Sequence, residues 1–89
     1  MKKQLMQIIA IPGLLTAEEM EIAQSLVRAG EFELAYEGVI TQGYERDAEL
    51  TLPEVEYIYD FGIRHGLDVS RGGTWLADTK ARSIRNGLR

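Results

Sequence analysis

The chain has 89 residues, of which 45% are apolar and 27% are charged, so it can bury one small core and is too apolar for a disordered chain. It contains no cysteine and only one histidine, His65, which excludes disulfides, thiolate metal sites and multi-histidine metal centres. The net charge of -4 is segregated, because residues 16–60 carry twelve acids and two bases whereas residues 61–89 carry two acids and six bases. Such concentrated negative charge attracts a basic partner and repels nucleic acid.

The first predicted element is a helix over residues 3–10, where Leu5, Ile8 and Ile9 share one face at three- and four-residue spacing. Pro12 disfavours helical backbone at the residue before it, and Pro12-Gly13 is a turn signal, so this helix must end early. A short strand over residues 8–11 is the alternative interpretation.

A second helix is predicted to begin at Thr16, because Thr16 and Glu19 have the spacing of a capping box. Gly30 provides its C-terminal stop. The apolar stripe expected on this helix consists of Met20, Ala23, Leu26 and Val27. The segment after Gly30 opens with acids and has helical spacing at Phe32, Ala35 and Val39. Because the linker is so short, the second and third helices should form an antiparallel pair.

Residues 41–50 include Gly43 and a charged centre and have no clear period, which predicts a loop of about ten residues. Thr51 then gives a second start signal, with Pro53 in the first turn and Glu54 three residues after the cap. Gly66 is expected to end this fourth helix. Its inward stripe is predicted to consist of Val55, Ile58, Tyr59 and Ile63.

Glycines punctuate residues 66–73, and Thr74 is predicted to cap a last helix that ends near Asn86-Gly87. The apolar stripe expected on this helix consists of Ala77, Ala81, Ile84 and Leu88. Since no segment alternates like a strand, the predicted fold class is all-α: a small single-domain bundle of four to five short helices over residues 1–89. No apolar run approaches the roughly 20 residues that cross a bilayer. We therefore expect a cytoplasmic protein without a membrane partner.

The acids are interpreted as a binding surface. Catalytic carboxylate pairs need burial or close approach to shift their pKa values, whereas these acids fall at helix caps and on outward faces. Tyrosines interspersed among acids suit an interface with an arginine- or lysine-rich protein. The predicted partner-binding residues are Glu33, Tyr36, Glu37, Tyr44, Glu45, Asp47, Glu49, Glu56, Tyr57 and Asp60. We expect no catalytic residue, metal, cofactor or small-molecule substrate.

Three other interpretations stay open. A solvated acidic surface that keeps the protein soluble explains the same acids equally well. A small nucleic-acid-binding regulatory module could use the basic C-terminal helix, residues 80–89, with Trp75 stacking on a base. The net negative charge disfavours a nucleic-acid partner, and a lone tryptophan in a small domain is usually a core residue. A subunit that exchanges helices with a second copy is the third interpretation.

One stretch of the chain resembles a known family. Residues 29–37 read Ala-Gly-Glu-Phe-Glu-Leu-Ala-Tyr-Glu, and after a loop come Thr51-Leu52-Pro53-Glu54, Tyr57-Ile58 and Gly66-Leu67-Asp68. This pattern is similar to the small helical immunity proteins of bacterial polymorphic toxin and contact-dependent growth inhibition systems, especially the MafI-like group. The resemblance implies a cytoplasmic antidote without catalytic residues, which binds a toxin domain delivered by a neighbouring cell. That toxin is commonly a nuclease and in some cases an EndoU-type RNase. Combined with the charge pattern, it leads us to expect an acidic face that covers the basic active-site cleft of a cognate toxin.

Overall fold

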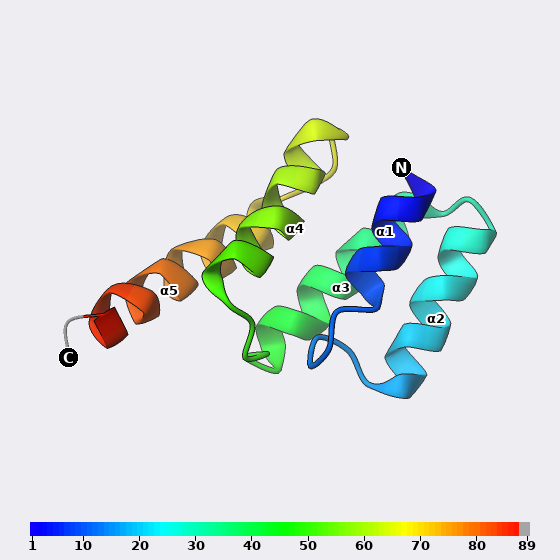
Figure 1. Cartoon of the computed structure of the whole chain (residues 1–89). Helices are drawn as coiled ribbons and strands as arrows, with labels where there is room; N and C mark the ends of the chain where they lie inside the picture. Colours follow the sequence, from blue (N-terminus) through cyan, green and yellow to red (C-terminus); the bar gives the residue numbers. More distant parts are fainter. Residues whose placement is uncertain (88–89) are drawn as a thin grey trace. The chain divides into compact units, whose positions relative to one another are not determined.

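The computed structural model describes residues 1–87, which form five α-helices (Figure 1). The helices are α1 (Lys2–Ile9), α2 (Ala17–Arg28), α3 (Phe32–Glu45), α4 (Leu52–Arg64) and α5 (Ser70–Gly87). No strand occurs among the described residues, so the predicted all-α fold class is confirmed. None of the helices formed by residues 1–87 combines the length and the apolarity that a membrane crossing requires.

The chain divides into two compact units. The N-terminal unit, Met1–Glu49, holds α1, α2 and α3, each of which packs on the other two. The C-terminal unit begins at Leu50 and holds α4, which packs on α5. The single domain expected over residues 1–89 stays a prediction.

The start of the chain forms the predicted helix, α1, and the alternative strand is wrong. Leu5, Ile8 and Ile9 are all fully buried, as their spacing predicts. The turn signal at Pro12-Gly13 is confirmed, because Gly13 has a φ of 83° in the left-handed region that glycine adopts without a steric penalty.

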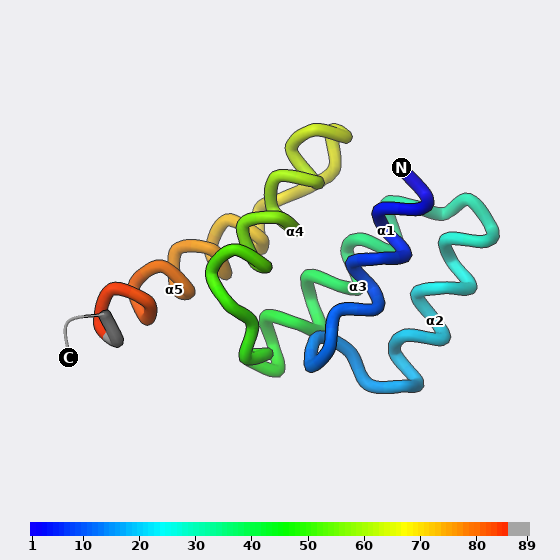
Figure 2. Tube along the Cα trace, viewed as in Figure 1, coloured from blue at the N-terminus to red at the C-terminus, as the bar shows by residue number. Residues whose placement is uncertain are grey.

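Backbone signals fix both ends of α2. Thr16 Oγ1 accepts a hydrogen bond from the Glu19 N–H at 3.1 Å, and Glu19 Oε1 accepts one from the Thr16 N–H at 2.8 Å, which is the predicted capping box. At the other end Gly30 has a φ of 81°, and the Glu31 N–H donates to the Leu26 carbonyl at 2.8 Å. This Schellman turn reverses the chain within three residues, so α3 runs antiparallel to α2 (Figure 2).

The loop predicted over residues 41–50 is wrong in its first half, because α3 continues to Glu45. Gly43 weakens the local preference for helix by about 1 kcal/mol. However, the residues buried on α3 recur at helical spacing through this segment: Ala35, Tyr36, Val39, Ile40 and Gly43. Burial of this continuous face outweighs the local preference, since most helix stability in proteins comes from packing.

The helix α4 begins and ends where its sequence signals predict. Thr51 Oγ1 accepts from the Glu54 N–H at 3.3 Å while Glu54 Oε1 accepts from the Thr51 N–H at 2.8 Å, which forms a second capping box. Gly66, with a φ of 66°, ends the helix, and the Leu67 N–H donates to the Gly62 carbonyl at 2.9 Å.

The inward stripe of α4 is only partly as predicted. Val55 and Ile58 are buried and Tyr59 is half-buried, but Ile63 is 53% exposed. Gly62 takes the buried position in its place. The helical period explains this correction, because residue 62 lies seven positions after Val55, which is two helical turns, and residue 63 is rotated away from that line.

The helix α5 begins five residues earlier than predicted, at Ser70 and not at Trp75, so Thr74 is not its cap. Asp68 Oδ1 accepts hydrogen bonds from the N–H of Ser70 at 3.0 Å and from its hydroxyl at 2.7 Å, and this acid fixes the start of the helix. Gly73 lies inside the helix against α4, where an added Cβ would lie 3.7 Å from Cε1 of Tyr59. Gly72 and Gly73 therefore lie within the helix and do not form a loop.

The stripe predicted to be buried on α5 faces solvent instead. Ala77, Ala81 and Ile84 are exposed, Ile84 by 66%, and Leu88 lies outside the described residues. The buried positions are Gly72, Trp75 and Thr79. The Thr79 hydroxyl donates to the Trp75 carbonyl at 2.8 Å, which satisfies this polar group inside the unit. The face that carries Trp75 is the one packed on α4, and it buries the largest apolar side chain of this helix.

Candidate functional site

The first part of the predicted acidic surface lies along α3. Glu33 and Glu37 are one turn apart, and both are exposed. Tyr44 lies two turns beyond Glu37 on the same side of the helix and is half-buried. The outward side of α3 therefore presents two carboxylates and part of one aromatic ring in a line. Glu33 and Glu37 are exposed as predicted, whereas Tyr44 was predicted in a loop and lies on the helix.

Tyr36 does not belong to this surface. It is fully buried on the inward side of α3, together with Ala35, Val39 and Ile40. Its predicted contact with a partner is therefore wrong, because a buried side chain offers no area to another protein. The residue before Glu37 is rotated by about 100° around the helix axis, and this rotation carries its ring into the core.

Three further predicted acids, Glu45, Asp47 and Glu49, are exposed around the C-terminal end of α3. Asp47 has a φ of 52°, and the Ala48 N–H donates to the Gly43 carbonyl at 2.9 Å. This is the Schellman turn that Gly30 forms after α2, with an aspartate in the left-handed position. Because Ala48 is buried, the turn is anchored and holds its acids in a defined arrangement.

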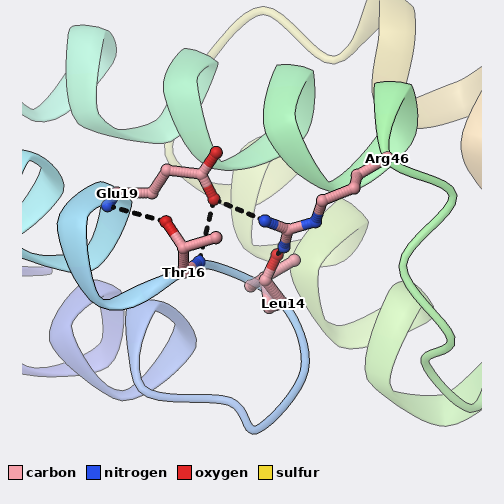
Figure 3. A network of polar contacts seen from close by, with 4 residues as sticks. All are labelled: Leu14, Thr16, Glu19 and Arg46. Carbon is pink, nitrogen blue, oxygen red and sulfur yellow. Dashed lines mark hydrogen bonds and ion pairs between the residues drawn. The ribbon is translucent and has the colours of Figure 1, made fainter.

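Arg46, the single base in the sequence from Glu31 to Glu49, is directed toward the start of α2. Its Nη1 donates to Glu19 Oε1 at 2.7 Å, and its Nη2 donates to the carbonyl of Leu14 (Figure 3). The Thr16 N–H donates to the same Glu19 oxygen. The Thr16 N–H and then the Arg46 guanidinium hold the pKa of Glu19 below its usual range. This network connects the end of α3 to the start of α2.

The remaining predicted site residues lie on α4, in the C-terminal unit. Glu56 and Asp60 are one turn apart, but only Asp60 is exposed and Glu56 is half-buried. Tyr57 is 39% exposed. This part of the surface is thus smaller and less acidic than the part on α3.

The basic residues of the alternative function lie on α5. Lys80 and Arg85 are exposed and Arg82 is half-buried, whereas Arg89 lies outside the described residues. Trp75 is only 2% exposed, so the interpretation of this tryptophan as a core residue is confirmed. Its ring has no exposed face on which a base could stack.

A groove between α2 and α3 was not predicted. It has a volume of about 100 Å³, and the small residues Ala23, Ala35 and Gly38 line it together with Ile22 and Leu26. Ile22 is 63% exposed, and a Cβ added at Gly38 would meet nothing within 4 Å. We refer to this feature as the α2–α3 groove. The one sequence signal for it was Ile22, an isoleucine that does not fit the apolar stripe of its helix.

Comparisons of this chain with protein-family models, with curated proteins and with solved structures find no match. The fold defines an all-α protein of two compact helical units.

Proposed function

We propose that the protein is an immunity protein that binds and neutralises a cognate toxin domain in the cytoplasm. The proposed toxin is a nuclease, with an EndoU-type RNase as the specific candidate. In this mechanism the acidic face covers the basic active-site cleft, imitates the charge of phosphate groups and excludes the nucleic-acid substrate. The inhibition is stoichiometric, and the immunity protein catalyses no reaction.

The observation that carries this proposal is the exposure of five acids on one helix and the turn that follows it. These acids are Glu33, Glu37, Glu45, Asp47 and Glu49. The base among them, Arg46, binds Glu19 and the Leu14 carbonyl on the side of α2. Acids concentrated in this way produce a negative potential that speeds association with a cationic protein and is screened by salt.

The test is a pair of charge-reversal variants with a matched control. Glu33→Lys combined with Glu37→Lys should abolish protection of cells that express the toxin domain, because the change places two cations against a basic cleft. The control is Glu18→Lys combined with Glu21→Lys, which changes the net charge equally at two exposed residues of α2. We expect the control to keep most of the protection. Binding of the purified proteins, measured at low and high salt, should follow the same order.

A second pair, Glu56→Lys with Asp60→Lys, tests the part of the surface on α4. Loss of protection through this pair alone would move the interface to the C-terminal unit. Full protection by both pairs would overturn the proposed acidic face. The toxin for these experiments would be the cationic C-terminal domain of a large secreted protein encoded beside this gene.

The alternative function, a nucleic-acid-binding regulatory module, is favoured by the exposure of Lys80 and Arg85 and weakened by the burial of Trp75. A gel-shift experiment with RNA and DNA separates the two functions. Binding that Lys80→Ala combined with Arg85→Ala abolishes would support the alternative.

A further inference from the structure

The α2–α3 groove combines apolar area with acidic edges. Ile22 is 63% exposed at its edge, and Leu34, 52% exposed, lies one turn before Gly38 on α3. Glu18 lies one turn before Ile22, and Glu37 lies next to Gly38. Between Ala17 and Glu45 the sequence carries seven acids and one base. The groove therefore suits an apolar ridge with basic residues on both sides.

The same chain carries such a ridge on α5. Ala77, Ala81 and Ile84 are exposed at spacings of four and three residues and form one line along the helix, the α5 strip. Lys80 lies one turn before Ile84, and Arg85 lies one turn after Ala81, so both bases flank the strip. The helix as a whole carries four bases and one acid. Its core-facing side, with Trp75 and Thr79, is already buried, so the strip is a second apolar face.

We propose that α5 of a second copy of this chain docks its α5 strip into the α2–α3 groove. In this contact Ile84 of one copy would cover Ile22 of the other, while Lys80 and Arg85 meet the acids that border the groove. These two isoleucines have the largest exposed fractions among the large apolar residues that are described. Their mutual burial removes apolar area from water, and the charges select the pairing of unlike surfaces.

The proposed contact joins two different surfaces and is therefore heterologous. Such contacts close into rings or continue into longer assemblies. One helix in a groove buries less than the roughly 1,200–2,000 Å² of a standard stable interface, so the association should be weak and should increase with concentration. Its charged borders should make it weaker at high salt. The contact shares Glu37 with the proposed toxin-binding face, but it does not depend on the toxin.

The experiment measures the weight-average mass of the full chain by light scattering and sedimentation over a wide range of concentrations. At low salt we expect the mass to rise above the monomer mass of 10.0 kDa. Ile22→Asp and Ile84→Asp should each return it to the monomer value. Ile63→Asp is the matched control, because Ile63 is an isoleucine on α4 with a similar exposed fraction, 53%, outside both surfaces. We expect this variant to associate like the original chain.

A mixture of the two variants identifies the pairing. Ile22→Asp keeps an intact α5 strip and Ile84→Asp keeps an intact groove, so an equimolar mixture should regain association but stop at the dimer. A monomeric original chain at all concentrations would overturn the proposal, as would association retained by either variant alone. A mixture that stays monomeric would also contradict it. Circular dichroism of each variant controls for loss of fold.

Discussion

The two units reach stability by different means. In the N-terminal unit three helices pack on one another around many aliphatic residues, such as Leu5 and Ile8, together with the buried ring of Tyr36. The C-terminal unit has only two helices, and its largest fully buried side chain is Trp75, on α5. Gly62 and Gly72 are buried there, and Gly73 lies beside Tyr59 of α4. A pair of helices covers less area than three, so it needs a large aromatic residue to bury enough apolar surface.

Charge separates the two units as clearly as packing does. The N-terminal unit carries nine acids and four bases, whereas the chain from Leu50 onward carries five acids and six bases. The unit with the more extensive aliphatic core thus also carries the proposed binding surface. Stable packing beneath a binding surface keeps its side chains in place when a partner arrives.

The largest effect on the difference between the two units is expected from removal of Trp75. Trp75→Ala should lower the free energy of unfolding by about 3–5 kcal/mol, because it leaves a large cavity between two helices. Hydrogen exchange should then lose protection in α4 and α5 more than in α2 and α3. The control Ile63→Ala changes an exposed residue of α4 and should cost less than about 0.5 kcal/mol. Equal losses in both units would show that they unfold together, as a single domain does.

Substitutions in the Schellman turns should have smaller effects on the free energy of unfolding. Gly66→Ala should cost about 1–2 kcal/mol, because alanine at a φ of 66° strains the backbone, although its Cβ would meet nothing within 4 Å. Asp47→Gly should stabilise the N-terminal unit by about 0.5–1 kcal/mol, since it removes the same strain at a φ of 52°. Urea unfolding midpoints measure both changes. Destabilisation by Asp47→Gly would mean that the aspartate side chain stabilises its turn by more than its backbone conformation costs.

The smallest expected effect is on the dependence of stability on pH, and each unit supplies one acid. The pKa of Glu19 is lowered by the Thr16 N–H and Arg46, and the pKa of Asp68 is lowered by the N–H and hydroxyl of Ser70. An acid whose pKa is lower in the folded state adds stability above its unfolded pKa, and that stability is lost as the pH falls through the folded pKa. Stability should thus decline below about pH 4.5 for Glu19 and below about pH 3.8 for Asp68.

Single variants show which of the two acids causes the loss of stability at low pH. Glu19→Gln should reduce the acid sensitivity of the N-terminal unit and also its salt dependence, because Glu19 pairs with Arg46. Asp68→Asn should reduce the acid sensitivity of the C-terminal unit without a change in salt dependence of the same size, since its main partners are the neutral groups of Ser70. Urea midpoints between pH 6 and pH 2 test both expectations. Unchanged pH profiles in both variants would contradict the assignment.

The helix boundaries were largely predictable from the sequence because their signals are local. Thr16 and Thr51 each cap a helix through a glutamate three residues later, and Gly30 and Gly66 end the helices that follow. These residues act through their own backbone and its nearest neighbours, so no distant contact is needed to interpret them. The C-terminal part of α3 was missed because Gly43 lowers helix propensity, and only burial in the N-terminal unit compensates for it.

The acidic surface was predictable in its charge and only partly in its members. Glu33 and Glu37 are exposed as expected, because a charged residue is seldom buried without a partner. Tyr36 was misplaced because tyrosine suits both a core and an interface, and its neighbours in sequence do not decide between them. The α2–α3 groove could not be predicted, since it exists only where two helices leave small residues opposite each other.

Local signals in the sequence determined where α1 to α4 begin, where most of the helices end, and which part of the chain is acidic. Tertiary packing decided which side of each helix is buried, as the exposed Ile63 and Ile84 and the buried Trp75 show. The physical reason is the range of the interactions. Caps and charges act within a turn or through solvent, whereas burial depends on how much apolar area a neighbouring helix can cover.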